Sequence, residues 1–147
     1  MKIYIGTDHA GFELKEEIVS FLKEQGYEVE DKGAEKLNLE DDYPDFILPV
    51  AKAVAAEENS RGIILGSSGQ GEALAANKIK GVRAVVYYGG SPEIIRLSRE
   101  HNDANVLSLG AHFLDVNDAK EMINLWLSTR FSEEERHVRR LRKISEV

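Results

Sequence analysis

The amino-acid sequence predicts an α/β protein. Short apolar segments of strand length alternate with longer segments in which apolar residues recur at helical spacing. This alternation is typical of a parallel sheet with helices on both faces. We therefore expect a three-layer α/β/α, Rossmann-like fold that has a five-stranded parallel sheet and a C-terminal helix. The expected strands are Lys2–Gly6, Tyr27–Glu30, Arg61–Leu65, Val82–Tyr88 and Val106–Gly110.

The helices follow from apolar periodicity and from residues that end helices. In the first helix, Leu14, Ile18, Phe21 and Leu22 share one face, and Gly26 provides a C-terminal stop. Comparable segments occur between the other strands. The expected helices run from before Leu14 to Gly26, from Tyr43 to about Asn59, over Ala73–Ile79, from Ser91 to about His101 and from Asp115 to about Ser128.

Several local signals complete this order. Ser91 is a suitable N-cap, and Pro92 follows it at the first helical position. The segment Ser132–Glu135 has the spacing of a capping box, so we expect the last helix to begin there. The polar segment Asp31–Asp42 has no periodicity and is expected to be a loop.

Composition limits the class of protein. The chain has 147 residues, of which 42% are hydrophobic and 31% charged, as expected for one globular domain spanning 1–147. It contains no cysteine, which excludes a disulfide, a thiolate metal site and a cysteine nucleophile. No apolar run reaches the roughly 20 residues that cross a bilayer, and the sequence opens on a strand pattern rather than a signal peptide. We expect a cytoplasmic protein without a membrane partner. The net charge of −7 argues against a nucleic-acid partner.

The stretch Gly66–Lys78 carries the strongest local signal. It joins an apolar strand to a helix through glycines and serines, which permit close backbone approach and leave amide groups free. Glu72 lies where the helix should begin. One interpretation is an anion-holding loop with a base beside it. The other is an ordinary tight turn whose acid is favoured by the helix dipole.

The predicted topology brings distant loops together. Ligands bind beside the carboxyl ends of the strands in such folds. Asp8 and His9, in the loop after the first strand, are therefore expected near Ser67, Ser68 and Glu72.

Histidines and arginines provide further candidate functional residues. His9 lies in a polar loop where a purely structural histidine would gain little. His101 ends the fourth helix, where an interaction with the helix dipole is an equal alternative. Arg136 and Arg140 are four residues apart and share a helix face, which suits one phosphate group; a solvated charged face is the alternative.

Neither a metal nor a nucleotide cofactor is expected. No histidines have the spacing of a zinc motif. The glycine-rich loop at Gly66 is not a nucleotide-binding motif, because its lysine comes too late and it does not follow the first strand.

Five blocks in this order resemble the RpiB/LacAB family of sugar-phosphate isomerases, and the resemblance covers almost the whole chain. The blocks are Gly6–Gly11 (GTDHAG), Asp42–Asp45 (DYPD), Gly69–Lys78 (GQGEALAANK), Arg99–Asn105 (REHNDAN) and Arg136–Arg140 (RHVRR).

The resemblance implies an aldose–ketose isomerase that interconverts ribose 5-phosphate and ribulose 5-phosphate through an enediolate, without a metal. It implies that His101 assists ring opening, with Asp8 as its proton partner. Ser68 would help to move a proton between the two sugar oxygens, and the amides of Gly69–Gly71 with Asn102 would hold the charge of the enediolate.

The resemblance also assigns substrate contacts. Arg136, Arg140 and His9 would hold the phosphate, and Tyr43 would border the sugar. The implied substrate-binding residues are His9, Tyr43, Ser67, Gly69, Gln70, Gly71, Asn102, His112, Arg136, His137 and Arg140.

The sequence departs from a common form of this family at two positions. Many members have a cysteine base where this chain has Gly66, whereas a second branch has a glutamate at the position of Glu72. The resemblance therefore assigns the base to Glu72. Many relatives also have an arginine at the position of His112, which leaves the choice between five- and six-carbon substrates open.

Three other functions are compatible with the sequence. They are an isomerase of allose or galactose 6-phosphate, a non-catalytic sugar-phosphate binding protein, and a structural protein of the same fold. The resemblance further implies a homodimer, or a dimer of dimers, whose active site is shared between subunits.

Overall fold

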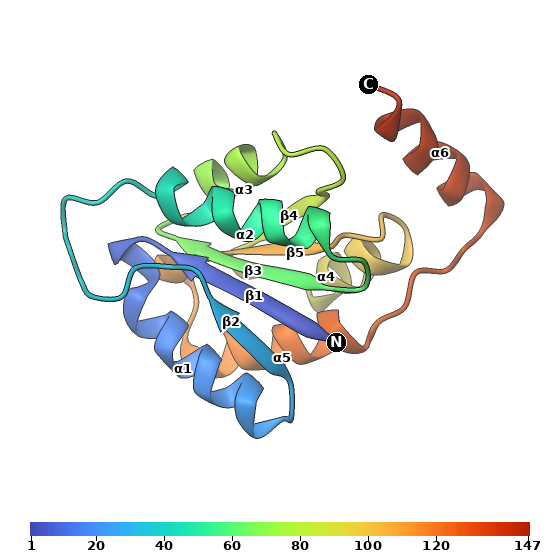
Figure 1. The fold of residues 1–147 in the computed structure, drawn as a ribbon. Helices are drawn as coiled ribbons and strands as arrows, with labels where there is room; N and C mark the ends of the chain where they lie inside the picture. The colour runs from blue at the N-terminus through green and yellow to red at the C-terminus, as the bar shows by residue number, and fades with distance from the viewer.

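The computed structural model describes residues 1–147 and contains a five-stranded parallel sheet in the order β2-β1-β3-β5-β4 (Figure 1). All four neighbouring strand pairs are parallel. The predicted α/β fold is therefore confirmed, and the order of the outer strands is now known. The strands are β1 (Lys2–Thr7), β2 (Glu28–Asp31), β3 (Arg61–Gly66), β4 (Ala84–Tyr87) and β5 (Val106–Gly110).

Helices cover both faces of the sheet. In Figure 1, α2 and α3 lie above the sheet, and α1 and α5 lie below it. Two short 3-10 helices follow β1 and β5. The α-helices are α1 (Phe12–Glu24), α2 (Pro44–Ala56), α3 (Gln70–Ala76), α4 (Pro92–Glu100), α5 (Val116–Ser128) and α6 (Glu135–Ser145); the 3-10 helices are η1 (His9–Gly11) and η2 (Ala111–Phe113).

The core has two parts because successive side chains of a strand point to opposite faces of the sheet. Ile3 and Ile5 of β1 belong to the larger apolar cluster, which packs against α1, α4 and α5. Tyr4, between them, belongs to the smaller cluster beneath α2 and α3. Trp126 of α5 is fully buried in the larger cluster.

Some helix ends differ from their predicted positions. α2 ends at Ala56 rather than near Asn59, which has a φ of 66°. α3 occupies Gln70–Ala76 rather than Ala73–Ile79. Beyond its end, the Asn77 side chain accepts the backbone N–H of residue 84 at 2.8 Å and donates to the carbonyl of the same residue at 3.0 Å.

The predicted capping box before α6 is wrong. The helix begins at Glu135, and Glu134, at its N-cap, makes no side-chain capping bond. The preceding residue, Glu133, has a φ of 59°, which interrupts the helix that Ser132 was expected to cap. The hydroxyl of Ser132 instead accepts the N–H of Glu134 at 3.4 Å.

The C-terminal helix stands apart from the rest of the molecule. In Figure 1, α6 lies at the upper right, after an extended connection from α5, whereas the loop after β2 lies at the far left. His137 is its only buried residue. None of the helices is both long and apolar enough to cross a lipid bilayer.

Candidate active site

The candidate site lies where the parallel strands end. All the loops that follow the strands meet at one edge of the sheet, to the left in Figure 1. Residues after β1, β3 and β5, together with the start of α2, contribute to it. We call them the strand-end cluster: Asp8, His9, Tyr43, Ser67, Ser68, Gly69, Gln70, Gly71, Glu72 and His112.

In the loop after β1, two carboxylates surround one imidazole. Asp8 is 6% exposed and accepts the N–H of Ala10 at 3.0 Å. Nδ1 of His9 lies 2.6 Å from Oδ1 of Asp41, and the backbone N–H of His9 donates to the same oxygen at 3.1 Å. The hydrogen bond with Asp41 raises the pKa of His9. The imidazole is held at Nδ1, so that Nε2 is left for a ligand.

Asp41 is a further candidate residue, to which no pattern in the sequence pointed. It lies near the end of the long loop after β2, where no periodicity or motif distinguishes it. The start of that loop is held by the buried Lys15, whose Nζ contacts Asp31 at 2.7 Å and donates to the carbonyl of Ala34 at 3.1 Å. Only this tertiary arrangement brings Asp41 to His9.

Asp8, His9 and Asp41 are also the one group of side chains that could hold a metal ion, since one ligand atom of each lies within 4.8 Å of the others. Their geometry has a simpler explanation. Oδ1 of Asp41 already binds His9 twice, and Oδ1 of Asp8 caps η1. Oδ2 of Asp41, in contrast, is buried without a hydrogen-bond partner.

The loop after β3 is shaped by backbone contacts. Gly69 has a φ of 78°, a left-handed conformation that favours glycine, and its carbonyl accepts a hydrogen bond from Ser108 at 2.7 Å. The hydroxyl of Ser68 accepts the N–H of Gln70 at 3.3 Å. Because the first N–H groups of a helix have no partner within it, the start of α3 presents donors to this edge.

The carboxylate of Glu72 occupies the space beside Gly66. Glu72 lies in the first turn of α3 and is 5% exposed. A β-carbon added to Gly66 would overlap both oxygens of the Glu72 carboxylate. The glycine at the end of β3 is therefore what allows the glutamate to turn inwards. This pairing of residues 66 and 72 could not be seen from the sequence alone.

Burial dominates the electrostatics of this carboxylate. It raises the pKa of Glu72, and the nearby charge of Asp8 raises it further, although the backbone N–H of Glu72 opposes the shift. Burial likewise raises the pKa of Asp8. Asp8 and Glu72, far apart in sequence, are thus brought close enough to influence each other, and both favour the protonated form more than free carboxylates do.

Three further residues border the same edge. The ring of Tyr43 lies against Gly71, because a β-carbon at residue 71 would meet the tyrosine hydroxyl at 2.6 Å. Ser67 and His112 contact each other through Oγ and Nδ1 at 2.6 Å, and the N–H of His112 donates to the carbonyl of Ser67 at 3.1 Å. His112 is therefore part of the strand-end cluster.

The remaining candidate residues lie elsewhere. His101 follows the C-terminal end of α4, which runs back toward the edge where the strands begin. We call this group the helix-end cluster: His101, Asn102, Arg136, His137 and Arg140. The structure does not bring it to the strand-end cluster of the same chain, so Asp8 and His101 are not neighbours within one chain.

The helix-end cluster is organised by two histidines. The rings of His101 and His137 are stacked with centroids 4.1 Å apart and an interplanar angle of 16°. His137 is 4% exposed, its Nε2 is buried without a partner, and burial lowers its pKa. Arg136 pairs with Glu134 at 3.0 Å, whereas Arg140 forms no ion pair.

Comparison with known proteins identifies close relatives. A family model described as Ribose/Galactose Isomerase matches residues 3–144. The chain is 40% identical to ribose-5-phosphate isomerase B of Mycobacterium leprae over 146 residues, which cover 99% of this chain and 89% of that protein.

Solved structures give the same result. A structure of ribose-5-phosphate isomerase B from Clostridium thermocellum is 46% identical with a TM-score of 0.93, covering 99% of this chain and 96% of that one. The enzyme from Mycoplasma genitalium, solved with bound ribulose 5-phosphate, is 36% identical with a TM-score of 0.93, covering 99% and 94% of the two chains.

Proposed function

This chain belongs to the ribose/galactose isomerase family, and on that premise we propose that it interconverts ribose 5-phosphate and ribulose 5-phosphate. The observation that carries the proposal is the buried carboxylate of Glu72, which lies beside Gly66 at the edge where the loops converge. A base in this position faces the loop that presents amide donors. The relatives named above supply the substrate class.

In the proposed reaction, Glu72 transfers one proton between two carbons. It removes the proton from C2 of the open-chain aldose, which leaves an enediolate, and returns it to C1 to give the ketose. The raised pKa of Glu72 suits this role, because a base that must also release its proton works best with a pKa near the working pH.

The loop after β3 would stabilise the charge of the enediolate. The amides at the start of α3, from Gly69 to Gly71, are the proposed donors, and such donors commonly contribute about 3 kcal/mol each. The hydroxyl of Ser68 would carry the proton that must move between O1 and O2. Tyr43, packed against Gly71, would border the sugar.

Asp41 is proposed to position His9. Its carboxylate holds Nδ1, which directs Nε2 outwards and favours the imidazolium form. A cation directed in this way suits an anionic substrate.

We further propose a homodimer in which the helix-end cluster of one chain completes the strand-end cluster of the other. Ring opening by His101, charge stabilisation by Asn102 and phosphate binding by Arg136 and Arg140 cannot serve Glu72 of the same chain. The isolated position of α6 and the unpartnered Nε2 of His137 support a partner at this surface.

A six-carbon sugar phosphate is the second candidate substrate. Nδ1 of His112 contacts Oγ of Ser67, and histidine is shorter than the arginine that the family resemblance leads us to expect here, so a longer sugar could be accommodated at this position.

The test is a turnover assay with purified protein. Formation of ribulose 5-phosphate from ribose 5-phosphate is measured with and without a chelator, and allose 6-phosphate is assayed in parallel. We expect Glu72→Gln to abolish turnover while ribose 5-phosphate still binds. Glu24→Gln, which removes an exposed carboxylate from α1, is the matched control. Turnover retained by Glu72→Gln would refute the assignment of the base.

A further inference from the structure

A second polar pocket lies away from the strand-end cluster. It has a volume of about 570 Å³ and is formed where β3 begins, beside the segment that connects α5 to α6. Arg61, Arg99 and Arg130 line it, and Glu133 is the only acidic residue in its lining. The charged side chains of the lining thus carry a net positive charge, although the whole chain carries −7.

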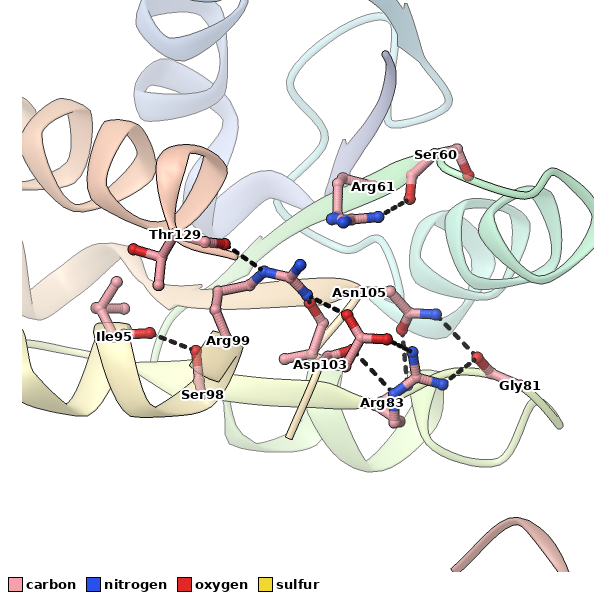
Figure 2. A network of polar contacts seen from close by, with 11 residues as sticks. Ser60, Arg61, Gly81, Arg83, Ile95, Ser98, Arg99, Asp103, Asn105 and Thr129 are labelled. Atoms are coloured by element: carbon pink, nitrogen blue, oxygen red, sulfur yellow. Dashed lines mark hydrogen bonds and ion pairs between the residues drawn. The ribbon is translucent and has the colours of Figure 1, made fainter. Parts of the chain in front are cut away.

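Arg99 is the buried arginine of the pocket lining. It is 4% exposed and donates from Nε to the carbonyl of Thr129 at 3.2 Å and from Nη1 to Asp103 at 2.9 Å and to the carbonyl of Ala104 at 2.6 Å. None of these bonds uses Nη2. Figure 2 shows this free nitrogen on the side of the guanidinium that faces Arg61.

Arg61 has no carboxylate partner. Its one hydrogen bond runs from Nη1 to the carbonyl of Ser60 at 2.9 Å. Two other arginines do have carboxylate partners: Arg83 pairs with Asp103 at 3.2 Å and Arg96 pairs with Glu100 at 3.0 Å. Burial lowers the pKa of Arg61 and the charge of Arg99 lowers it further, although the charge of Asp103 opposes the shift. Asp103 already pairs with Nη1 of Arg99 at 2.9 Å, so Arg61 is the cation of the pair that has no carboxylate of its own.

We propose that this pocket binds an anion with a phosphoryl group, held between Arg61 and Arg99 and bordered by Arg130. Guanidinium groups suit phosphate oxygens because they offer several N–H donors in one plane. An anion here would relieve the repulsion between the half-buried Arg61 and the buried Arg99. The site is separate from the proposed active site, which uses neither Arg61 nor Arg99.

Equilibrium dialysis with labelled inorganic phosphate tests the proposal. We expect the wild-type chain to bind one phosphate per chain more than Arg61→Gln does, whereas Arg140→Ala keeps this phosphate. Isomerase activity in Arg61→Gln should be unchanged and shows that the variant is folded. If Arg61→Gln does not fold, Arg130→Gln, which alters an exposed side chain, is expected to weaken phosphate binding at this site at least threefold.

Arg96→Gln is the matched control, since it removes an arginine of α4 that carboxylates already satisfy, and it should bind as much phosphate as the wild type. Competition by ribose 5-phosphate, by adenosine 5′-monophosphate or by neither identifies the source of the phosphoryl group. Equal phosphate stoichiometry in Arg61→Gln and wild type, or unchanged affinity in a folded Arg130→Gln variant, would overturn the proposal.

Discussion

At the scale of single residues, the site depends on the missing side chain at residue 66. The Glu72 carboxylate fills the volume that a side chain at this position would need. A cysteine base at residue 66 and an inward glutamate at residue 72 are therefore sterically exclusive in this backbone. In this chain, a base at one of these two positions therefore excludes a base at the other.

Gly66→Ala should consequently displace the proposed base. Because a misplacement of about 1 Å can cost roughly 100-fold in rate, we expect kcat to fall about 100-fold or more. Overpacking should also lower the free energy of unfolding by about 1–3 kcal/mol. Kinetics and urea denaturation measure the two effects.

A double-mutant cycle separates this collision from a general effect of alanine in β3. In a Glu72→Ala background the carboxylate is gone, so Gly66→Ala should cost much less stability than in the wild type. Equal costs in both backgrounds would show that residue 72 is not what occupies the space.

Asp41→Asn tests the positioning of His9. The hydrogen bond with Asp41 raises the pKa of His9, so the imidazolium persists to a higher pH in the wild type. In the variant the cation should be lost at a lower pH. We expect KM for ribose 5-phosphate to rise about tenfold near pH 7. The increase of KM with pH should begin at a lower pH than in the wild type, and kcat at low pH should change little.

A pH profile of KM and kcat measures this effect, and Asp42→Asn, at the neighbouring exposed position, is the control. If Asp41→Asn lowers kcat equally at every pH and leaves KM unchanged, Asp41 does not act through the charge of His9.

At the scale of elements, the helix ends show where a local sequence signal is enough to predict the start of a helix. Ser91 caps α4 as predicted, since its Oγ accepts the N–H of Glu93 at 3.2 Å. Ser132 has an equally good motif but caps no helix. The motif describes only nearest neighbours along the chain, whereas α6 is placed by the contact of His137 with His101.

These two serines give a matched pair of variants. Ser91→Ala should lower the free energy of unfolding by about 1 kcal/mol, because the first turn of α4 loses its cap. Ser132→Ala should change it by less than about 0.5 kcal/mol, as is usual for exposed surface positions. Thermal or urea denaturation compares them, and equal losses would contradict the structure of the α5–α6 connection.

The sequence allowed the sheet and most helices to be predicted, because apolar periodicity is a property of each segment by itself. It also pointed to Glu72 and the loop at Gly66 as candidates for the site, and their roles stay predictions. It could not identify Asp41, since only the tertiary path of the loop after β2 brings this residue to His9. The position of His101 depends on the direction of α4 rather than on its motif.

At the scale of the whole molecule, the main question is how the strand-end and helix-end clusters meet. In one chain they lie at opposite edges of the sheet. If a second copy supplies the missing half, each active site contains Glu72 from one chain and His101 from its partner. Two variants, each inactive alone, should then complement each other.

Glu72→Gln and His101→Asn provide this test when the two are co-expressed in equal amounts. Random pairing makes half of the dimers mixed, and each mixed dimer has one site in which both residues are intact. We therefore expect about one quarter of the wild-type kcat per site.

Each variant expressed alone is the control. Co-expression of Glu72→Gln with Gly66→Ala should give no such rescue, because both changes affect the same half of the site. If co-expression of Glu72→Gln with His101→Asn gives only the summed activity of the two variants expressed alone, the two clusters do not act across a dimer interface. The proposed division of the site between subunits would then be wrong.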